Sequence, residues 1–377
     1  MLREQFLLPE DTVYMCGHSL GPCFKNLAKA LDDTLTIYAK QGVLSWETDW
    51  MKLSTQVSKS LAALIGAQSN EVVVTDSTSI NLYKVLKACL AMQPKRQRIL
   101  TTQDNFPADL YIAKGIAEVI VVPEHQLIDH LDESIAILML THVNYRSGAI
   151  VDYETINKKA HQYGVLTVLD LSHSVGIVPL DMASSGIDFA VGCTYKYLSG
   201  GPGSPAFIYA NKKHHASMQT PIQGWMGHQK PFDFDADYES KGVKQFLGGT
   251  PAIFSLQALA TALGHFDADL IIKLYEHTKV YTKTLSKTLI SLGLEVLGAE
   301  KQGGHIAFCH PYGYGISQAL ISHGVICDYR EPNLVRLCVN PLYLTTKDLE
   351  TCIERLVDIL YHKRYLHRTF NTRKEVT

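Results

Sequence analysis

Residues 165–203 read VLTVLDLSHSVGIVPLDMASSGIDFAVGCTYKYLSGGPG, and the architecture of the whole chain can be predicted from this pattern. The runs 165–171 and 187–193 are almost wholly apolar, as is typical of strands buried on both faces of a sheet. Similar runs recur along the chain, with helical segments between them. These strands are expected at 71–76, 98–102, 135–142 and 206–210, and the helices at 79–92, 107–118 and 153–163. The alternation predicts an α/β fold with a mainly parallel sheet flanked by helices.

From Pro251 onward, long helical segments replace the alternation. Further helices are expected at 22–40, 253–265, 268–292, 316–323 and 346–361. We therefore expect a large α/β domain at residues 46–265. Residues 1–45, as an N-terminal arm, and residues 266–377 are expected to form a smaller α+β domain.

The composition excludes several classes of protein. Of 377 residues, 46% are hydrophobic and 19% are charged, which excludes a largely disordered chain. The 35 Lys and Arg residues are balanced by 37 Asp and Glu residues, which argues against nucleic-acid binding through a positive field. No apolar run reaches the roughly 18 residues of a membrane span, and the first residues lack the pattern of a signal peptide.

The eight cysteines are scattered, and none belongs to a C-x-x-C pair. In a chain of this length, that pattern predicts reduced thiols and a cytoplasmic protein. The His and Cys residues also lack the spacing of zinc ligands, so we expect no metal site.

Polar and aromatic residues follow the predicted strands, at the edge where open α/β sheets bind ligands. Thr78 and Ser79 begin a helix, where hydroxyl and N–H groups suit a phosphate, although such residues are also common helix caps. Phe106 follows the strand at 98–102. Its side chain can stack on the ring of a ligand, or it can act as a hydrophobic staple before Pro107.

Asp170 and Lys196 lie at the ends of two successive strands. An unpaired carboxylate at Asp170 would be costly, so we expect it to face a cation such as a protonated ring nitrogen, or else to cap the next turn. Lys196 lies between two tyrosines before a Gly-rich turn, and partial burial there favours the free amine that forms Schiff bases. His173 can form a hydrogen bond to a ligand, or it can form one to a polar group of its own loop.

Together these residues supply what pyridoxal 5′-phosphate needs: a phosphate cradle, an aromatic surface, a carboxylate for the pyridine nitrogen and a lysine for the aldehyde. The sequence therefore predicts this cofactor.

Eight segments of the chain resemble the kynureninase family, which belongs to the fold-type I, or aspartate aminotransferase-like, pyridoxal-phosphate enzymes. They are GHSLGP, STSINL, NFPADLY, VLDLSHSVG, CTYKYLSGGPG, GWMGH, FLGGTPAIFSL and LVRLCVNPLY, in the family's order over most of the chain. The resemblance implies hydrolysis of L-kynurenine, or of its 3-hydroxy derivative, to anthranilate and L-alanine by cleavage of the Cβ–Cγ bond. It also implies a homodimer with shared active sites.

The resemblance assigns roles to individual residues. Lys196 would bond to the cofactor, Asp170 would hold the pyridine nitrogen, and Tyr195 would contact the phosphate and relay a proton. Arg336 would hold the substrate α-carboxylate. The other implied cofactor contacts are Thr78, Ser79, Phe106, Asp109, Thr141 and His173, with Trp225 and Thr250 offered across the dimer interface.

The chain departs from the family in its early loop, where His18 replaces the usual Asn of G-N-S-L-G. A contact between His18 and the substrate would change the ring preference. Trp46 matches an aromatic residue near the substrate ring. Gly249-Thr250 resembles the bacterial form of its loop, which favours L-kynurenine over the 3-hydroxy derivative.

Three other functions stay open. A cysteine desulfurase-like lyase usually has His before the lysine, where this chain has Tyr195, and it also needs a mobile reactive cysteine. An aminotransferase acting on a different amino acid is the second. A non-catalytic cofactor-binding relative is the third, and His18 is the only hint of it.

Overall fold

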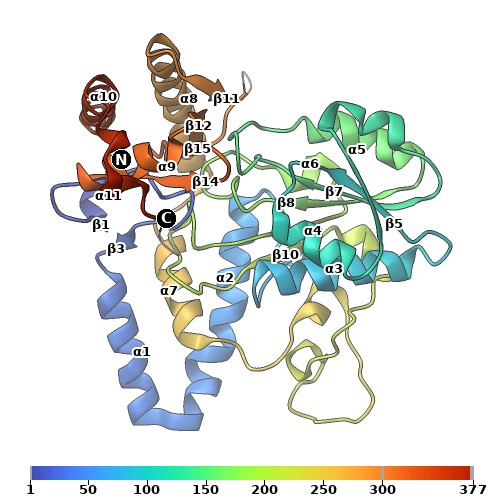
Figure 1. Cartoon of the computed structure of the whole chain (residues 1–377). Coiled ribbons are helices and arrows are strands. Elements are labelled where there is room, and N and C mark those ends of the chain that lie inside the picture. Colours follow the sequence, from blue (N-terminus) through green and yellow to red (C-terminus); the bar gives the residue numbers. More distant parts are fainter. Residues whose placement is uncertain (1, 299–300, 374–377) are drawn as a thin grey trace.

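The computed structural model describes residues 2–298 and 301–373, so the last residues of the predicted small domain, 374–377, lie outside the described residues. Its centre is a seven-stranded sheet with the order β4-β10-β9-β8-β7-β5-β6 (Figure 1). The strands are β4 (Val72–Val74), β5 (Arg98–Thr102), β6 (Glu118–Val122), β7 (Ile135–Thr141), β8 (Leu166–Asp170), β9 (Phe189–Gly192) and β10 (Phe207–Ala210). Only β10 runs antiparallel to its neighbours, which confirms a mainly parallel sheet.

Helices cover both faces of this sheet (Figure 1). Successive residues of a strand point to opposite faces. In β7, Leu138 and Leu140 therefore join one apolar core while Ile137 and Met139 join the other. The first core also contains α2 (Met51–Leu64), α5 (Tyr153–Gln162) and α7 (Ile253–Leu263), and the second contains α3 (Thr78–Met92) and α4 (Pro107–Lys114). The apolar runs are continuous because both faces are buried.

A second, antiparallel sheet of four strands lies beside the first, in the order β11-β12-β15-β14. Its strands are β11 (Glu295–Leu297), β12 (His305–Cys309), β14 (Asp328–Arg330) and β15 (Leu334–Cys338), and its helices are α8 (Ala268–Ser291), α9 (Gly313–Ser322) and α10 (Thr346–Tyr361). The domain boundaries given above stay a prediction.

The N-terminal segment forms two short pairings and one long helix. β1 (Phe6–Leu7) pairs with β3 (Cys23–Phe24), and β2 (Val13–Tyr14) pairs with β13 (Val325–Ile326), which follows α9. α1 (Leu27–Gln41) then packs against α7.

Some expected elements are wrong in their bounds. The helix expected at 107–118 ends at Lys114, and the β-branched run EVIVV becomes the edge strand β6, because Gly115 closes the helix. The helix expected from residue 22 begins at Leu27, because residues 23 and 24 pair with β1. The sequence reasoning also missed α2. Among the described residues, none of the helices is long and apolar enough to cross a bilayer.

A buried charge cluster lies at the amino end of β9, the opposite end from the residues discussed below. Asp188 is 1% exposed and accepts hydrogen bonds from His161, Lys213 and His214 at 2.6–2.9 Å. Its Oδ2 also accepts the Thr167 N–H at 2.8 Å. Burial by itself raises the pKa of Asp188, but these hydrogen bonds outweigh it and hold the pKa well below its usual value.

Candidate active site

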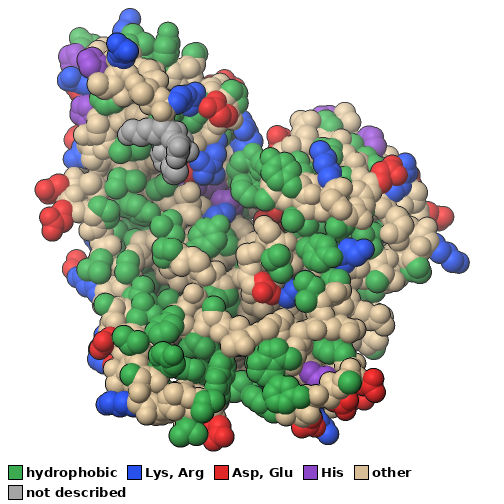
Figure 2. All heavy atoms as spheres, turned by 60° about the horizontal axis from the view of Figure 1, so that its bottom comes forward, with side chains coloured by type: hydrophobic (Ala, Val, Ile, Leu, Met, Phe, Trp, Pro, Cys, Tyr) green, Lys and Arg blue, Asp and Glu red, His purple; other side chains and the backbone are tan. Residues whose placement is uncertain are grey.

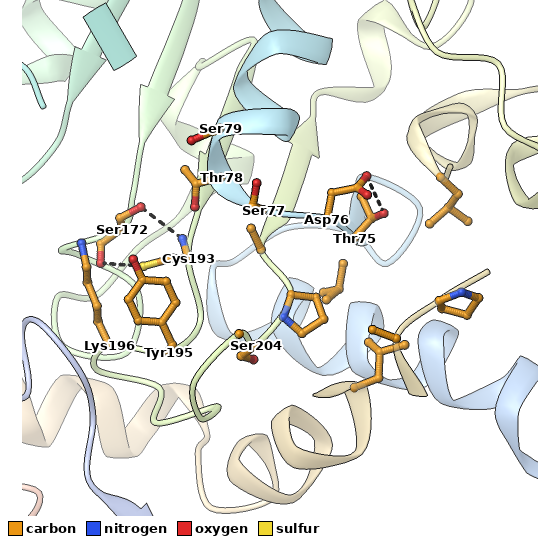
Figure 3. Close-up of a pocket in the computed structure, with 18 of the residues that line it drawn as sticks. Thr75, Asp76, Ser77, Thr78, Ser79, Ser172, Cys193, Tyr195, Lys196 and Ser204 are labelled. Atoms are coloured by element: carbon orange, nitrogen blue, oxygen red, sulfur yellow. Dashed lines mark hydrogen bonds between the residues drawn. The ribbon is translucent and has the colours of Figure 1, made fainter. Parts of the chain in front are cut away.

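A cavity of about 490 Å³ opens at the carboxyl ends of the parallel strands, where open α/β sheets bind ligands (Figure 3). Nine of the residues singled out in the sequence line it: Thr78, Ser79, Phe106, Asp109, Asp170, His173, Tyr195, Lys196 and Thr250. Asp76, just before α3, lines it as well. They come from the ends of β4, β5, β8 and β9 and from the segment before α7. The sheet topology therefore brings together residues that are far apart in sequence.

Lys196 lies on the cavity wall just after β9. Its Nζ is 3.3 Å from Nε2 of His173 and 5.8 Å from the ring centroid of Phe106. Burial lowers the pKa of His173, and the charge of Lys196 lowers it further, so the imidazole is neutral and can accept a hydrogen bond from the lysine.

The turn that carries Lys196 is held by backbone contacts. The Ser199 N–H donates to the Lys196 carbonyl at 2.9 Å, and the Gly21 N–H donates to the Tyr195 carbonyl at 2.8 Å. A Cβ at Gly21 would lie 2.2 Å from the Lys196 oxygen, so only glycine allows the early loop to approach this turn. The loop around Gly21 thus packs against the backbone of the turn that carries Lys196.

Asp170 is the last residue of β8, and its Oδ1 accepts the Ser172 N–H at 2.6 Å. The carboxyl group of Asp109, from the first turn of α4, lies next to that of Asp170. Burial raises the pKa of Asp109 well above its usual value, and the charge of Asp170 raises it further. Asp109 is therefore held in its neutral, protonated form.

The N-terminus of α3 forms the other end of the cavity. Ser77 caps this helix by accepting the Ile80 N–H, and the first N–H groups of a helix have no partner inside it. Thr78 and Ser79 lie in this first turn (Figure 3). Free N–H groups, two hydroxyls and the positive end of the helix dipole make this a place where an anion can bind.

Tyr195 lies beside Cys193 in the lining of the cavity (Figure 3). Burial raises the pKa of Tyr195, and the Cys193 thiol raises it further, so the phenol keeps its proton at neutral pH. Cys193 in turn donates through Sγ to the Ser172 carbonyl at 3.8 Å. A protonated phenol therefore lies next to Lys196, whose Nζ is 5.9 Å from the centroid of the Tyr195 ring.

Thr141, Trp46 and Trp225 do not line this cavity. Thr141 donates to Asn105 Oδ1, which also accepts the Phe106 N–H at 2.7 Å, so Thr141 acts one step away by holding the residue before Phe106. Trp46 lies between α1 and α2. Trp225 packs against exposed aromatic residues.

Arg336 also lies outside the cavity lining, in a buried ionic cluster of the small sheet. It faces Asp328 across β14 and β15, donating from Nε to Oδ1 at 2.8 Å and from Nη2 to Oδ2. Its Nη1 donates to the Tyr145 carbonyl at 2.6 Å, and the Tyr145 ring packs edge-on against Phe106 at the cavity wall. One N–H on each terminal nitrogen of Arg336 is left over, because a guanidinium has five N–H groups.

His18 belongs to the same cluster. It is fully buried, its Nε2 lies 3.2 Å from Asp328 Oδ1, and its ring stacks on His305 at 5.0 Å. Burial lowers the pKa of His18 to about 4 against the opposing charge of Asp328, so the ring is neutral and donates from Nε2. In the structure His18 contacts the carboxylate that holds Arg336, and it is not among the residues that line the cavity.

Sequence reasoning missed Asp328, Asn105 and Cys193. Asp328 carries a signal, since it is a lone carboxylate in the apolar run VICDY. Asn105 and Cys193 stand inside motifs that were quoted, but their types alone indicate no role.

The chain is similar to known proteins over its whole length. The family model described as aminotransferase class-V matches residues 23–322. Kynureninase of Pseudomonas fluorescens is 39% identical over 398 residues, covering 100% of this chain and 96% of that protein. Kynureninase of Burkholderia mallei strain SAVP1 gives the same identity and coverage.

Two solved structures share the fold. A mutant of C-DES with glycine covalently linked to the PLP cofactor has a TM-score of 0.86 at 19% identity, covering 94% of this chain and 99% of its own. The apo cysteine desulfurase of Thermococcus onnurineus NA1 has a TM-score of 0.83 at 18% identity, covering 96% and 98%. At these identities the likeness concerns the fold alone.

Proposed function

This chain belongs to the kynureninase family of the class-V aminotransferases, and from that premise we propose that it hydrolyses L-kynurenine to anthranilate and L-alanine with pyridoxal phosphate as cofactor. The observation that carries the proposal is the meeting of Lys196, Asp170 and the N-terminus of α3 around one cavity.

The groups around the cavity fit pyridoxal phosphate. Oδ2 of Asp109 is buried without a hydrogen-bond partner among the described residues, next to the Asp170 carboxylate, so this wall is incomplete without a donor. A pyridinium N–H would supply one to this pair of carboxyl groups, with Asp170 as its acceptor. Thr78, Ser79 and the α3 N–H groups suit the phosphate, Phe106 offers its ring, and Lys196 is the amine for the aldehyde.

When bound, the cofactor supplies an electron-withdrawing ring that stabilises negative charge on the substrate carbons. Asp170 would accept the N–H of the ring nitrogen and so keep that nitrogen protonated. The Nζ of Lys196 would take the proton from the substrate Cα, and neutral His173 would accept a hydrogen bond from this Nζ. Tyr195 donates its proton to the carbon released when the Cβ–Cγ bond breaks, and general acid help of this kind gives about 10²–10⁴ in rate. Water supplies the second carboxylate oxygen of anthranilate.

The unused N–H groups of Arg336 support its role as the receptor of the substrate α-carboxylate, since one on each terminal nitrogen suits a bidentate partner. Two arginines, Arg336 and Arg330, share the single carboxylate Asp328. The cluster thus has one positive charge in excess, which matches a substrate with one carboxylate. We propose L-kynurenine over its 3-hydroxy derivative, as the Gly249-Thr250 loop indicates.

We propose that the enzyme works as a cytoplasmic homodimer with shared active sites. Apolar side chains gather over the lower part of the molecule in Figure 2, where Figure 1 places the α1–α2 hairpin and the segment that carries Trp225. Val43 is 77% exposed at this hairpin, and Phe234, which stacks with Trp225, is 75% exposed. Exposed apolar surface of this kind is typical of an interface between subunits. A monomer at micromolar concentration in sedimentation would contradict the roles of Trp225 and Thr250.

The test is a spectrum of the purified protein with added pyridoxal phosphate, followed by addition of L-kynurenine. We expect a visible band from the lysine-bound cofactor and then anthranilate fluorescence. A band without anthranilate would refute the substrate, and no band would refute the cofactor. A parallel sample receives the 3-hydroxy derivative, and the ratio of the kcat/KM values for the two substrates decides the ring preference.

The fold likeness to cysteine desulfurases makes a lyase acting on cysteine the second candidate. Addition of L-cysteine to the same sample tests it, because such a lyase releases sulfide. Tyr195 in place of the usual His argues against it. So does the position of Cys23, the exposed cysteine, on strand β3 rather than on a loop beside the cavity.

A further inference from the structure

Lys84 is a buried lysine to which the proposed reaction gives no role. It lies in the second turn of α3, and its side chain is 1% exposed. Its Nζ donates to Asp76 Oδ2 at 2.5 Å and to the Phe246 carbonyl at 2.7 Å. A buried ammonium needs such partners, because burying an unpaired charge is costly.

The two acceptors belong to two separate segments that border the cavity near the N-terminus of α3. Asp76 precedes Ser77, the cap of α3 (Figure 3). Phe246 ends the 3₁₀ turn Gly242–Phe246, and the residues just after it, including Gly249 and Thr250, line the cavity. A single ammonium group therefore ties the loop before α3 to the loop that carries Thr250.

Asp76 has an unusual backbone at this point. Its φ is +43°, in the left-handed region that residues other than glycine rarely adopt. Its carboxylate lines the cavity and is 35% exposed, and it accepts a second hydrogen bond from Thr75 Oγ1 at 3.0 Å. The backbone of Asp76 is strained, and its negative charge repels a phosphate bound nearby. A carboxylate at this position therefore needs a positively charged partner.

We propose that Lys84 is a positioning residue for the cofactor phosphate, which neutralises Asp76 and joins the two loops that enclose the phosphate. The inference rests on the proposed function, because it takes the phosphate of pyridoxal phosphate as the ligand. Lys84 makes no contact with the substrate in this scheme. Its effect is confined to the phosphate end.

Binding of two cofactor forms to the apo protein tests the proposal. Pyridoxal phosphate and pyridoxal differ only in the phosphate, so the ratio of their Kd values, measured by absorbance titration, isolates the phosphate contribution. In Lys84→Met, an uncompensated Asp76 carboxylate faces the phosphate. We expect pyridoxal phosphate to bind at least tenfold more weakly and pyridoxal to change less than twofold.

Two further variants serve as controls. Lys87→Met removes the same charge one turn along α3, from a half-buried lysine, and should leave the ratio unchanged. The double variant Asp76→Asn/Lys84→Met removes both charges and should recover most of the lost affinity, since replacing both members of a buried pair is often neutral. If Lys84→Met does not fold, Lys84→Gln repeats the test with an amide donor left for the Phe246 carbonyl.

Equal weakening of both ligands in Lys84→Met would reduce Lys84 to a structural role and overturn the proposal. An unchanged ratio, or no recovery in the double variant, would also overturn it. A wild-type protein that does not bind pyridoxal phosphate would instead refute the proposed function.

Discussion

Replacing Arg336 by lysine should selectively weaken the use of substrates that carry an α-carboxylate. Arg336 has five N–H groups, of which two are given to Asp328 and one to the Tyr145 carbonyl. Lysine keeps the charge but has its three N–H groups on a single nitrogen. It cannot hold Asp328 and also offer a parallel pair to the substrate, so at least one hydrogen bond to the substrate carboxylate is lost.

A hydrogen bond to a charged group contributes about 1.5–3 kcal/mol, which corresponds to roughly 10–150-fold in kcat/KM. The assay is anthranilate release from L-kynurenine at several concentrations, with the decarboxylated analogue of kynurenine as the second substrate. Arg330→Lys is the matched control, because Arg330 contacts the same carboxylate at 3.0 Å from a more exposed position. It should cost less than about threefold.

An equal loss of kcat/KM on both substrates in Arg336→Lys would refute the reasoning, since it would show general damage rather than loss of a carboxylate receptor. A loss below about threefold on L-kynurenine would do the same, because the remaining N–H groups of Arg336 would then be unused.

Three other outcomes are expected. Lys196→Ala should abolish turnover while the thermal unfolding midpoint stays close to that of the wild type, and residual anthranilate release at the wild-type rate would remove Lys196 from its role. His18→Leu leaves Asp328 without one donor and should lower kcat/KM about tenfold, whereas His18→Gln keeps a donor near the position of Nε2 and should stay within about threefold. Asp188→Asn should lower the free energy of unfolding by about 3–5 kcal/mol at pH 7. Because the folded pKa of Asp188 lies well below its unfolded value, this stability is fully present above about pH 4 and is lost gradually as the pH falls from there toward the folded pKa. The difference in free energy of unfolding between the two proteins, measured by urea titration, should therefore shrink between about pH 4 and pH 3, and a constant difference over that range would contradict this account.

The residues at the sheet edge could be predicted from the sequence. Asp170 ends one buried strand and Lys196 follows the next, and the carboxyl ends of neighbouring parallel strands meet at one edge. This prediction is possible because strands that are buried on both faces appear in the sequence as continuous apolar runs, and the end of each run marks the end of a strand.

The ionic cluster around Arg336 could not be predicted in this way. Its contact with Asp328 depends on the register between β14 and β15, two short antiparallel strands. The contact of His18 with Asp328 depends on two segments 310 residues apart in the chain. A sequence pattern gives local periodicity, and it does not give the register of strands or the packing of distant loops.

The pairing of β2 with β13 has a consequence for how the protein is made. Met15 donates its N–H to the Ile326 carbonyl and accepts the Cys338 N–H, both at 2.8 Å, so the N-terminal segment is completed only by residues near the end of the chain. At about 5–20 residues per second, a ribosome needs roughly 15–60 s to add the residues between them. During that interval Val13 and Met15, both buried in the finished protein, have no permanent partner. This segment is therefore one on which a chaperone would act for a long time.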